Sequence, residues 1–244
     1  MISKNIIIDN IKTLFYALII AVIIRSIFLQ PFYIPSSSME PNLLVGDRLI
    51  ASKYTYGYSR HSFPFSPNIS SSRFFDKEPK RGDVIIFKTP ADNRTDYIKR
   101  LIGLPGDTIQ IINGNLHIND KLVKKDKIEL SKKIYCGEEI LDVLAYEETL
   151  DNGSKYIAVY RKEGTMKSTD KFRVPQNHYF FMGDNRDCSK DSRFLSSVGY
   201  VNKINLVGKA EMIFFSNEKK EGNLLKFWKW DNIIRFERFF KKIK

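Results

Sequence analysis

Three serines stand together between two prolines, in the segment Pro35-Ser36-Ser37-Ser38-Met39-Glu40-Pro41. A serine hydroxyl is a poor nucleophile at neutral pH and needs a general base to take its proton. The three histidines, His61, His117 and His178, are scattered, and none lies in a local signature of a serine hydrolase. A lysine can act as the base instead, if burial lowers its pKa toward neutrality.

Lys99 has the surroundings that such a base requires. It lies between Tyr97-Ile98 and Arg100-Leu101-Ile102, in an apolar stretch that predicts a strand. A third polar segment, Gly183 to Arg193, follows an apolar strand and is dense in hydrogen-bonding and charged side chains. Each feature has a simpler interpretation when taken alone: a serine-rich linker, a solvent-facing lysine and an exposed turn.

A long apolar run near the N-terminus bears on the compartment in which the chain works. Residues 13–29 form a run of seventeen residues in which Arg25 is the only charge, and Leu14–Ile24 is apolar throughout. A helix of this length spans roughly 26 Å, and the stems of Lys12 and Arg25 can carry their charges to the headgroups. The run predicts a retained membrane anchor. A buried core helix and a cleaved signal peptide are the alternatives, and cleavage would fall near the serine cluster.

The rest of the chain is predicted to be mostly β. Lys4 and Lys12 favour a cytoplasmic N-terminus, which places residues 31–244 outside the cytoplasm. Asn113-Gly114 between two apolar runs predicts a hairpin, and residues 59–82 predict a long surface loop. The expected strands are 48–56, 83–88, 97–102, 109–112, 115–118, 178–182 and 207–215.

These elements define five predicted regions. They are a cytoplasmic tip with the anchor (1–30), a first core part (31–119), an inserted β subdomain (120–172), a second core part (173–217) and a basic aromatic tail (218–244).

The tail carries nine Lys or Arg against four Asp or Glu, within a net charge of +12 for the 244-residue chain. Its aromatic and basic residues are interleaved, a mixture that suits a membrane interface but could also stack on nucleic-acid bases. An ordinary packed terminal helix is the alternative. The residues concerned are Lys226, Phe227, Trp228, Lys229, Trp230, Arg235, Phe236, Arg238, Phe239, Phe240, Lys241 and Lys242.

In their order along the chain, the motifs resemble those of bacterial type I signal peptidases, membrane-bound serine endopeptidases that remove signal peptides. The resemblance covers nearly the whole chain and rests on several matching segments together. They are Phe32 to Leu43 after the anchor, Gly46-Asp47-Arg48, Arg81-Gly82-Asp83-Val84-Ile85, Asp96 to Asp107 and Gly183 to Arg193.

The resemblance implies a role for each matching residue. Ser38 matches the nucleophile and Lys99 the general base. Ser36 matches the hydroxyl that joins the Ser38 N–H in the oxyanion hole, and Ser189 matches the hydroxyl that orients the lysine amine. Supporting ion pairs are implied at Arg100, Asp184, Asp191 and Arg193. Substrate-pocket positions are implied at Phe32, Ile34, Met39, Leu43, Tyr97 and Ile98.

The chain departs from the family pattern in places. Cys188 stands where the family usually has Asn, and Asn42 replaces a common Thr. Phe-Leu-Ser-Ser-Val at 194–198 replaces Tyr-Trp-Gly-x-Val and could reshape a loop near the site. Outside the cytoplasm a disulfide between Cys136 and Cys188 is compatible with the compartment, but the sequence does not show that the two are close.

Other classes of function have no support in the sequence. It contains no GxxxxGK[ST] or GxGxxG nucleotide motif, no HExxH, and too few cysteines for a four-cysteine zinc site. We therefore expect no metal and no cofactor. The expected partners are signal-peptide-bearing preproteins and the phospholipid membrane, with no nucleic acid.

The sequence thus predicts a serine endopeptidase that cleaves exported preproteins after small residues, at Ala-x-Ala sites, through an acyl-enzyme. It is expected in the bacterial inner membrane as a single-pass protein, with its catalytic domain on the periplasmic face. A membrane-tethered β module that binds exported chains, and a Ser/Lys hydrolase with another protein target, such as a self-cleaving repressor-type peptidase, are the alternatives.

Overall fold

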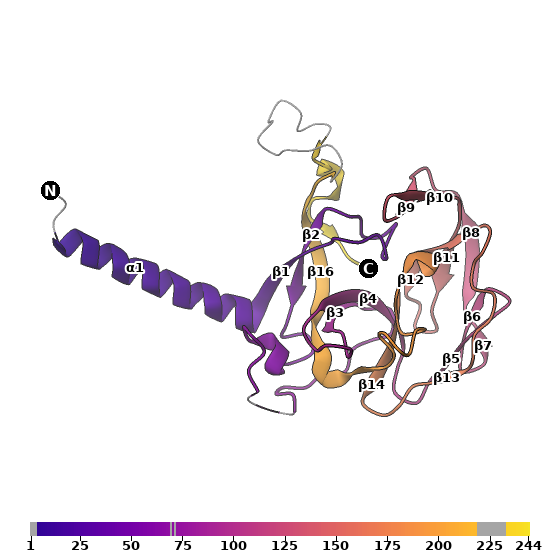
Figure 1. Cartoon of the computed structure of the whole chain (residues 1–244), viewed down its shortest axis with the longest axis horizontal. Coiled ribbons are helices and arrows are strands. Elements are labelled where there is room, and N and C mark those ends of the chain that lie inside the picture. The colour runs from indigo at the N-terminus through magenta and orange to yellow at the C-terminus, as the bar shows by residue number, and fades with distance from the viewer. Residues whose placement is uncertain (1–3, 69, 71, 219–232) are drawn as a thin grey trace.

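The computed structural model describes residues 4–68, 70, 72–218 and 233–244. One long helix projects from a body that consists almost entirely of strands (Figure 1). Helix α1 spans Lys4–Ile23, and a π-helical turn, Ile24–Phe28, continues it to strand β1, Leu29–Tyr33. A mostly β chain with an N-terminal apolar helix confirms the predicted fold class.

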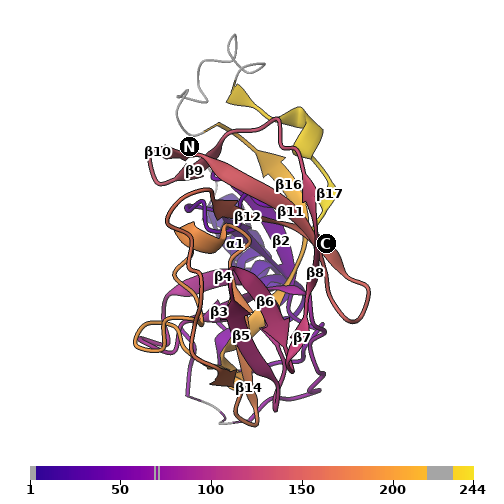
Figure 2. The ribbon, with the colours of Figure 1, turned by 90° about the vertical axis from the view of Figure 1, so that its right-hand side faces the viewer.

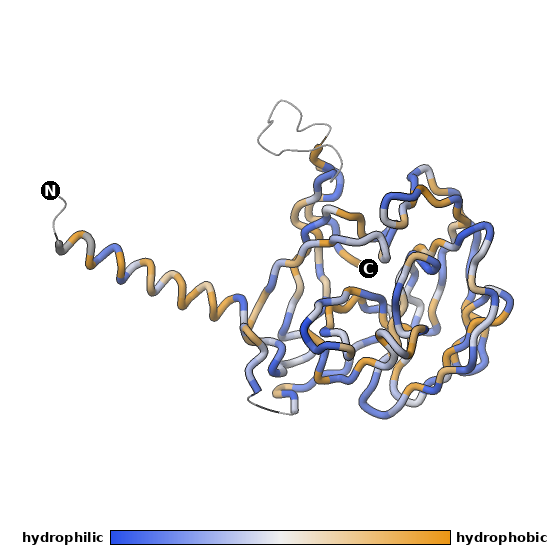
Figure 3. Tube along the Cα trace, in the orientation of Figure 1, coloured by the Kyte–Doolittle hydropathy of each residue, from blue (hydrophilic) through white to orange (hydrophobic). Residues whose placement is uncertain are grey.

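From Leu14 to its end at Ile23, helix α1 carries only apolar residues on every side (Figure 3), whereas its N-terminal turns also carry charged and polar residues. The stretch Ile8–Phe28 has 21 residues and a mean hydropathy of 2.0, and only 6% of it is buried. It is therefore long and apolar enough to cross a membrane, and a buried core helix does not describe it. The predicted span ran on to Leu29, which instead begins β1, a strand that contains Pro31.

The main sheet is antiparallel and has the order β1-β2-β16-β3-β4-β14-β15, with β17 pairing on β16. It combines segments from both ends of the chain, so that residues far apart in sequence become neighbours. Its further strands are β2 (Asp47–Ser52), β3 (Val84–Lys88), β4 (Asp96–Gly103), β14 (His178–Met182), β15 (Val201–Asn202), β16 (Leu206–Ser216) and β17 (Lys241–Lys242).

The middle of the chain forms smaller sheets beside the main one (Figure 2). A four-stranded sheet, β13-β5-β6-β7, contains the predicted hairpin at Asn113-Gly114, both of which have a positive φ. Its strands are β5 (Thr108–Ile112), β6 (Asn115–Ile118), β7 (Lys121–Leu122) and β13 (Phe172–Arg173). The predicted boundary at 119/120 falls between β6 and β7, two strands that pair with each other.

Two further β units complete this region. A three-stranded sheet has the order β12-β11-β8, and a short ribbon is formed by β9 and β10. Their bounds are Lys124–Ile128 (β8), Ile134–Cys136 (β9), Glu139–Leu141 (β10), Val143–Thr149 (β11) and Lys155–Arg161 (β12).

The end of the chain packs back on the main sheet. Arg238 is buried and forms an ion pair with Asp47, with 2.6 Å between Nη2 and Oδ2. Lys241 pairs with Ile213 across the β17–β16 ladder. The segment from residue 233 onward is therefore part of the body, whereas the predicted features at 219–232, which include Trp228 and Trp230, lie outside the described residues.

Candidate active site

Ser38 and Lys99 meet in the structure. Ser38 lies in the turn between β1 and β2, and Lys99 lies in β4. The Lys99 Nζ donates a hydrogen bond of 2.6 Å to the Ser38 Oγ and one of 3.1 Å to the Ile98 carbonyl. Three strands separate β1 from β4 in the sheet order, so the sheet curls to bring the two side chains together.

The Lys99 amine is buried, with only 3% of the residue exposed. Burial lowers its pKa from the ordinary 10.5 to about 8, although the charges of Asp191 and Asp184 oppose the shift. Desolvation disfavours the ammonium form, so a substantial fraction of the amine is neutral in weakly basic solution. A neutral amine beside a hydroxyl can accept its proton, which is what a general base requires.

Two further donors lie beside the Ser38 hydroxyl. The Ser36 Oγ is 3.4 Å from the Ser38 Oγ. The Ser38 backbone N–H has no hydrogen-bond partner among the described residues. Both groups are donors close enough to Ser38 to hydrogen-bond an oxyanion that forms next to it.

The backbone around Ser38 is held by the polar segment that follows β14. The Asn185 N–H donates to the Ser38 carbonyl across 3.1 Å, and its side-chain amide donates to the Ser37 carbonyl across 3.2 Å. Gly183 is needed for this approach, because a Cβ there would lie 2.5 Å from the Ser38 carbonyl oxygen and 2.2 Å from the Ser189 Oγ.

The four charged residues predicted as supports form two buried pairs. Arg100 binds Asp184 through two hydrogen bonds of 2.8 and 2.7 Å. Arg193 binds Asp191 through two of 2.8 and 2.9 Å, and Asp191 also accepts from the Gly183 N–H. Burial raises the pKa of the Asp191 carboxyl, but the Arg193 charge and these hydrogen bonds outweigh it and hold that pKa below its ordinary value.

The Ser189 hydroxyl is close to this network but is not bonded to the lysine. Its Oγ is buried and forms no hydrogen bond of good geometry within the described part of the chain. It lies against Gly183, where a Cβ would come within 2.2 Å of it, and close enough to the Asp191 carboxyl to help lower the pKa of that carboxyl. Its predicted role in orienting the amine therefore stays a prediction.

A second buried cluster behind the site was not predicted. Arg186 and Glu148 form a bidentate ion pair, with contacts of 2.6 and 2.9 Å, and both side chains are 1% exposed. The hydroxyls of Tyr156 and Tyr160 donate to the same carboxylate. Glu148 comes from the charge-rich region 120–172, where the sequence shows no chemical motif that could have identified it.

Asn42, one of the departures from the family pattern, also takes part in the network. Its side-chain amide donates to the Asp184 carboxylate and to the Ile157 carbonyl, each across 2.7 Å. Asn42 therefore links the turn between β1 and β2, which contains Ser38, to the Arg100–Asp184 pair and to β12.

A disulfide and a hydrogen bond attach the ribbon β9–β10 to the segments around Ser38. Cys136 and Cys188 form a disulfide, with 5.5 Å between their Cα atoms. The Tyr135 N–H donates to the Glu40 carboxylate across 2.8 Å, and Glu40 is only 3% exposed. Burial raises the pKa of the Glu40 carboxyl to about 7. The structure thus brings the two cysteines close together, which the sequence alone could not show.

A cavity of about 360 Å³ opens beside the Ser38–Lys99 pair. Four of the predicted substrate-pocket residues line it, namely Phe32, Ile34, Tyr97 and Ile98. The other two do not: Met39 and Leu43 are 0% and 1% exposed and pack in a core cluster with Leu49 and Val84. Within the described ranges, no group of three metal-ligating side chains occurs.

Comparison with known proteins assigns the family. The sequence profile of "Signal peptidase, peptidase S26" matches residues 7–215, so the chain belongs to this signal peptidase family. The Signal peptidase I of Rickettsia typhi is 38% identical over 247 residues, which cover 93% of this chain and 90% of that protein. That of Rickettsia bellii is 37% identical over 250 residues, covering 95% and 84%. A solved signal peptidase I from Enterococcus faecalis is 28% identical and covers 55% of this chain and 97% of its own, with a TM-score of 0.33.

Proposed function

We propose that the chain is a membrane-anchored serine endopeptidase that removes N-terminal signal peptides from exported preproteins. The observation that carries the proposal is the 2.6 Å hydrogen bond between the buried Lys99 amine and the Ser38 hydroxyl. Relatives that match almost the whole chain are named Signal peptidase I. A buried amine bonded to a serine supplies the base that this chemistry requires without histidine or metal.

In the proposed reaction, the Ser38 Oγ attacks the scissile carbonyl while its proton passes to the Lys99 Nζ. The carbonyl oxygen becomes an oxyanion, which the Ser38 N–H and the Ser36 hydroxyl stabilise. Lys99 then returns the proton to the leaving amine, and an acyl-enzyme remains on Ser38. Lys99 next takes a proton from water, the resulting hydroxide attacks the acyl carbonyl, and Ser38 recovers its proton from Lys99.

The cavity and the free edge of β1 define the proposed substrate site. Among the described residues, strand β1 pairs only with β2, so its other edge can hydrogen-bond an extended peptide. Phe32 lies in β1 and Ile34 directly follows that strand. Both line the cavity, together with Tyr97 and Ile98 of β4. The mostly apolar lining of the cavity supports a preference for small apolar side chains, and larger ones would be rejected by steric clash at the proposed Ala-x-Ala sites.

We further propose that α1 spans the inner membrane, with the N-terminus in the cytoplasm and the body on the periplasmic face. The exposed apolar surface of Ile8–Phe28 supports the span. The disulfide between Cys136 and Cys188 supports an oxidising compartment for the body.

The proposal is tested with a preprotein that carries an Ala-x-Ala site, incubated with the full-length protein in detergent and phospholipid. A matched preprotein with leucine in place of the last alanine is the control. We expect cleavage after the last alanine, identified by N-terminal sequencing, and at least tenfold slower cleavage of the control. Binding of both preproteins without cleavage would overturn the proposal in favour of a membrane-tethered binding module.

A further inference from the structure

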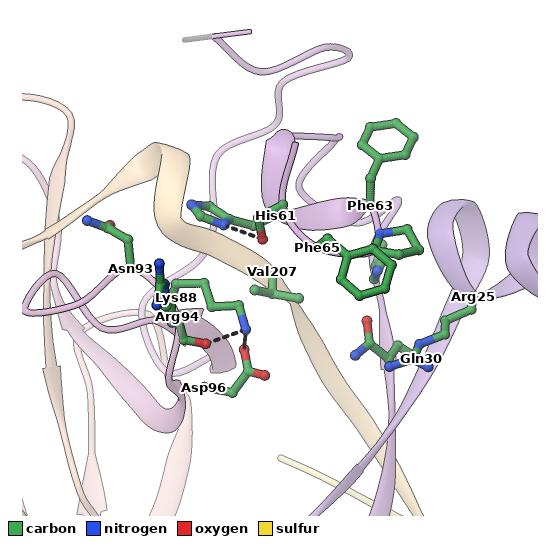
Figure 4. A pocket seen from close by; sticks show the side chains of 13 residues that line it. Arg25, Gln30, His61, Phe63, Phe65, Lys88, Asn93, Arg94, Asp96 and Val207 are labelled. Carbon is green, nitrogen blue, oxygen red and sulfur yellow. Dashed lines mark hydrogen bonds and ion pairs between the residues drawn. The ribbon is translucent and has the colours of Figure 1, made fainter. Parts of the chain in front are cut away.

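A second cavity lies where the anchor helix joins the body. Its volume is about 470 Å³, and it shares only Asp96 with the cavity beside Ser38. Figure 4 shows how its walls come from the end of the helix, the loop after β2 and the β3–β4 turn. Its cationic lining residues are Arg25, Lys53, Lys88 and Arg94.

The positive charge of this cavity is largely uncompensated. Asp96 is the only carboxylate in its lining, and it is paired with Lys88 across 2.8 Å. Lys53 is 2% exposed and donates to a neutral partner, the Ser62 carbonyl, across 2.5 Å. The side chains of Arg25 and Arg94 form no ion pair with any carboxylate in the described ranges. Four cations that face one carboxylate favour a bound anion.

Repulsion among these cations is visible at Lys53. Burial, together with the nearby charges of Arg25 and Lys88, lowers the pKa of its amine to about 8, although the charge of Asp96 opposes the shift. An anion placed between Arg25 and Lys53 would oppose both effects. The cavity is thus arranged for a negatively charged group that the chain itself does not supply.

The position of the cavity indicates which anion. Arg25 lies in the last turn of the apolar stretch Ile8–Phe28, which is the depth at which a spanning helix leaves the hydrocarbon. Phe65, in the loop that lines the cavity, is fully exposed. An aromatic side chain beside a basic cluster at the end of a spanning helix suits the headgroup region.

We propose that this cavity, lined by Arg25, Lys53, Lys88 and Arg94, binds the phosphate of an anionic phospholipid headgroup, while Phe65 enters the acyl boundary. The lipid would fix the catalytic body at one distance from the membrane surface, because Arg25 lies in the turn that joins the helix to β1 while Lys53, Lys88 and Arg94 belong to the body. The proposal rests on the membrane anchoring proposed above and is independent of the peptidase reaction.

The test uses the full-length protein in neutral detergent micelles. Short-chain phosphatidylglycerol is titrated in by calorimetry, with short-chain phosphatidylcholine, glycerol 3-phosphate and inorganic phosphate as separate arms. The variant is Arg25→Gln with Arg94→Gln, and the matched control is Lys121→Gln with Lys127→Gln, which removes two exposed charges from the distant β7 and β8. We expect ~30-fold weaker phosphatidylglycerol binding for the variant and no change for the control.

Further variants keep the outcome decisive. Arg94→Gln alone changes one exposed side chain and should weaken binding ~5-fold, even if the double variant does not fold. Phe65→Ser should weaken the binding of phosphatidylglycerol but leave the binding of glycerol 3-phosphate unchanged. Equal binding by wild type and folded Arg variants would overturn the proposal, and so would inorganic phosphate or glycerol 3-phosphate binding as tightly as the lipid. Flotation of the wild type with phosphatidylcholine vesicles tests the anchor separately.

Discussion

The Lys99 Nζ lies 2.6 Å from the Ser38 Oγ, although the two residues are 61 positions apart in the chain. Strand β4 carries the amine into the interior, and the turn after β1 presents the hydroxyl to it. Burial lowers the pKa of the amine, while the charges of Asp184 and Asp191 limit that shift. The fold therefore provides both the geometry and the proton affinity that a lysine base needs.

The pH dependence of cleavage follows from the Lys99 pKa of about 8. Only the neutral amine accepts the Ser38 proton, so kcat/KM should rise about tenfold per pH unit below pH 8 and level off above it. The measurement is kcat/KM from pH 6 to 10, with unfolding transitions recorded at the same pH values as a control. A profile that is flat between pH 6 and 9 in folded protein would contradict the role of Lys99.

Glu148→Gln should destabilise the fold strongly. It leaves the buried Arg186 guanidinium without its carboxylate, and breaking a buried pair in this way costs about 3–5 kcal/mol. Glu147→Gln is the matched control, because its partner Lys155 is exposed and water screens the pair. Urea unfolding of both variants is the measurement. Equal midpoints would show that the Arg186–Glu148 pair does not support the site.

This cluster shows where prediction from the sequence ends. Lys99 could be singled out because its apolar strand made it a candidate base and because the order of the motifs resembled that of a known family; the strand alone also allowed a solvent-facing position. Glu148 was not, because it lies among many exposed charges, and only the pairing of β11 with β12 buries it beside Arg186. A buried ion pair between distant segments leaves no local pattern in either one.

Reduction of the disulfide should affect both stability and activity. Cys136 and Cys188 close a loop of 52 residues, for which the chain-entropy relation gives about 4 kcal/mol. Because the bond holds β9 over Ser37 and Glu40, Cys136→Ser should also lower kcat/KM. Unfolding and cleavage are compared with and without dithiothreitol, and the double serine variant serves as the control that no longer responds. Thiol titration verifies that the reductant has broken the bond. If the stability and activity of the reduced wild type are then unchanged, the disulfide does not have this role.

Glu40 gives a pH effect on stability with the opposite sign to most carboxylates. Its folded pKa of about 7 exceeds the ordinary 4.5, so the folded state holds the proton more tightly. Stability is therefore lost as pH rises from about 4.5 to 7, by up to about 3 kcal/mol. Glu40→Gln removes this dependence and can still accept from the Tyr135 N–H.

Urea unfolding at pH 5 and pH 8 measures the effect of Glu40. The advantage of the Gln variant over the wild type should grow between these two pH values. A constant difference would show that Glu40 ionises normally in the folded protein.

The fold was largely predictable, and its exceptions have physical causes. Apolar patterns and turn signals were sufficient for β2, β3, β4, β14 and β16 of the main sheet, whereas β1, β15 and β17 were not predicted. Met39 and Leu43 were expected in a substrate pocket, but the turn after β1 directs both into the core, where they are almost fully buried. An apolar side chain next to a nucleophile can face a pocket or the core, and only the tertiary structure decides which.

The proposed mechanism requires Ser38 and Lys99 to act together on a peptide bond. Its most direct test is cleavage of one Ala-x-Ala preprotein by the wild type, Ser38→Ala and Lys99→Ala at equal amounts of folded protein. We expect the wild type to cleave after the last alanine and each variant to lose about 10³-fold or more in kcat/KM. Cleavage by either folded variant at the wild-type rate would contradict the account.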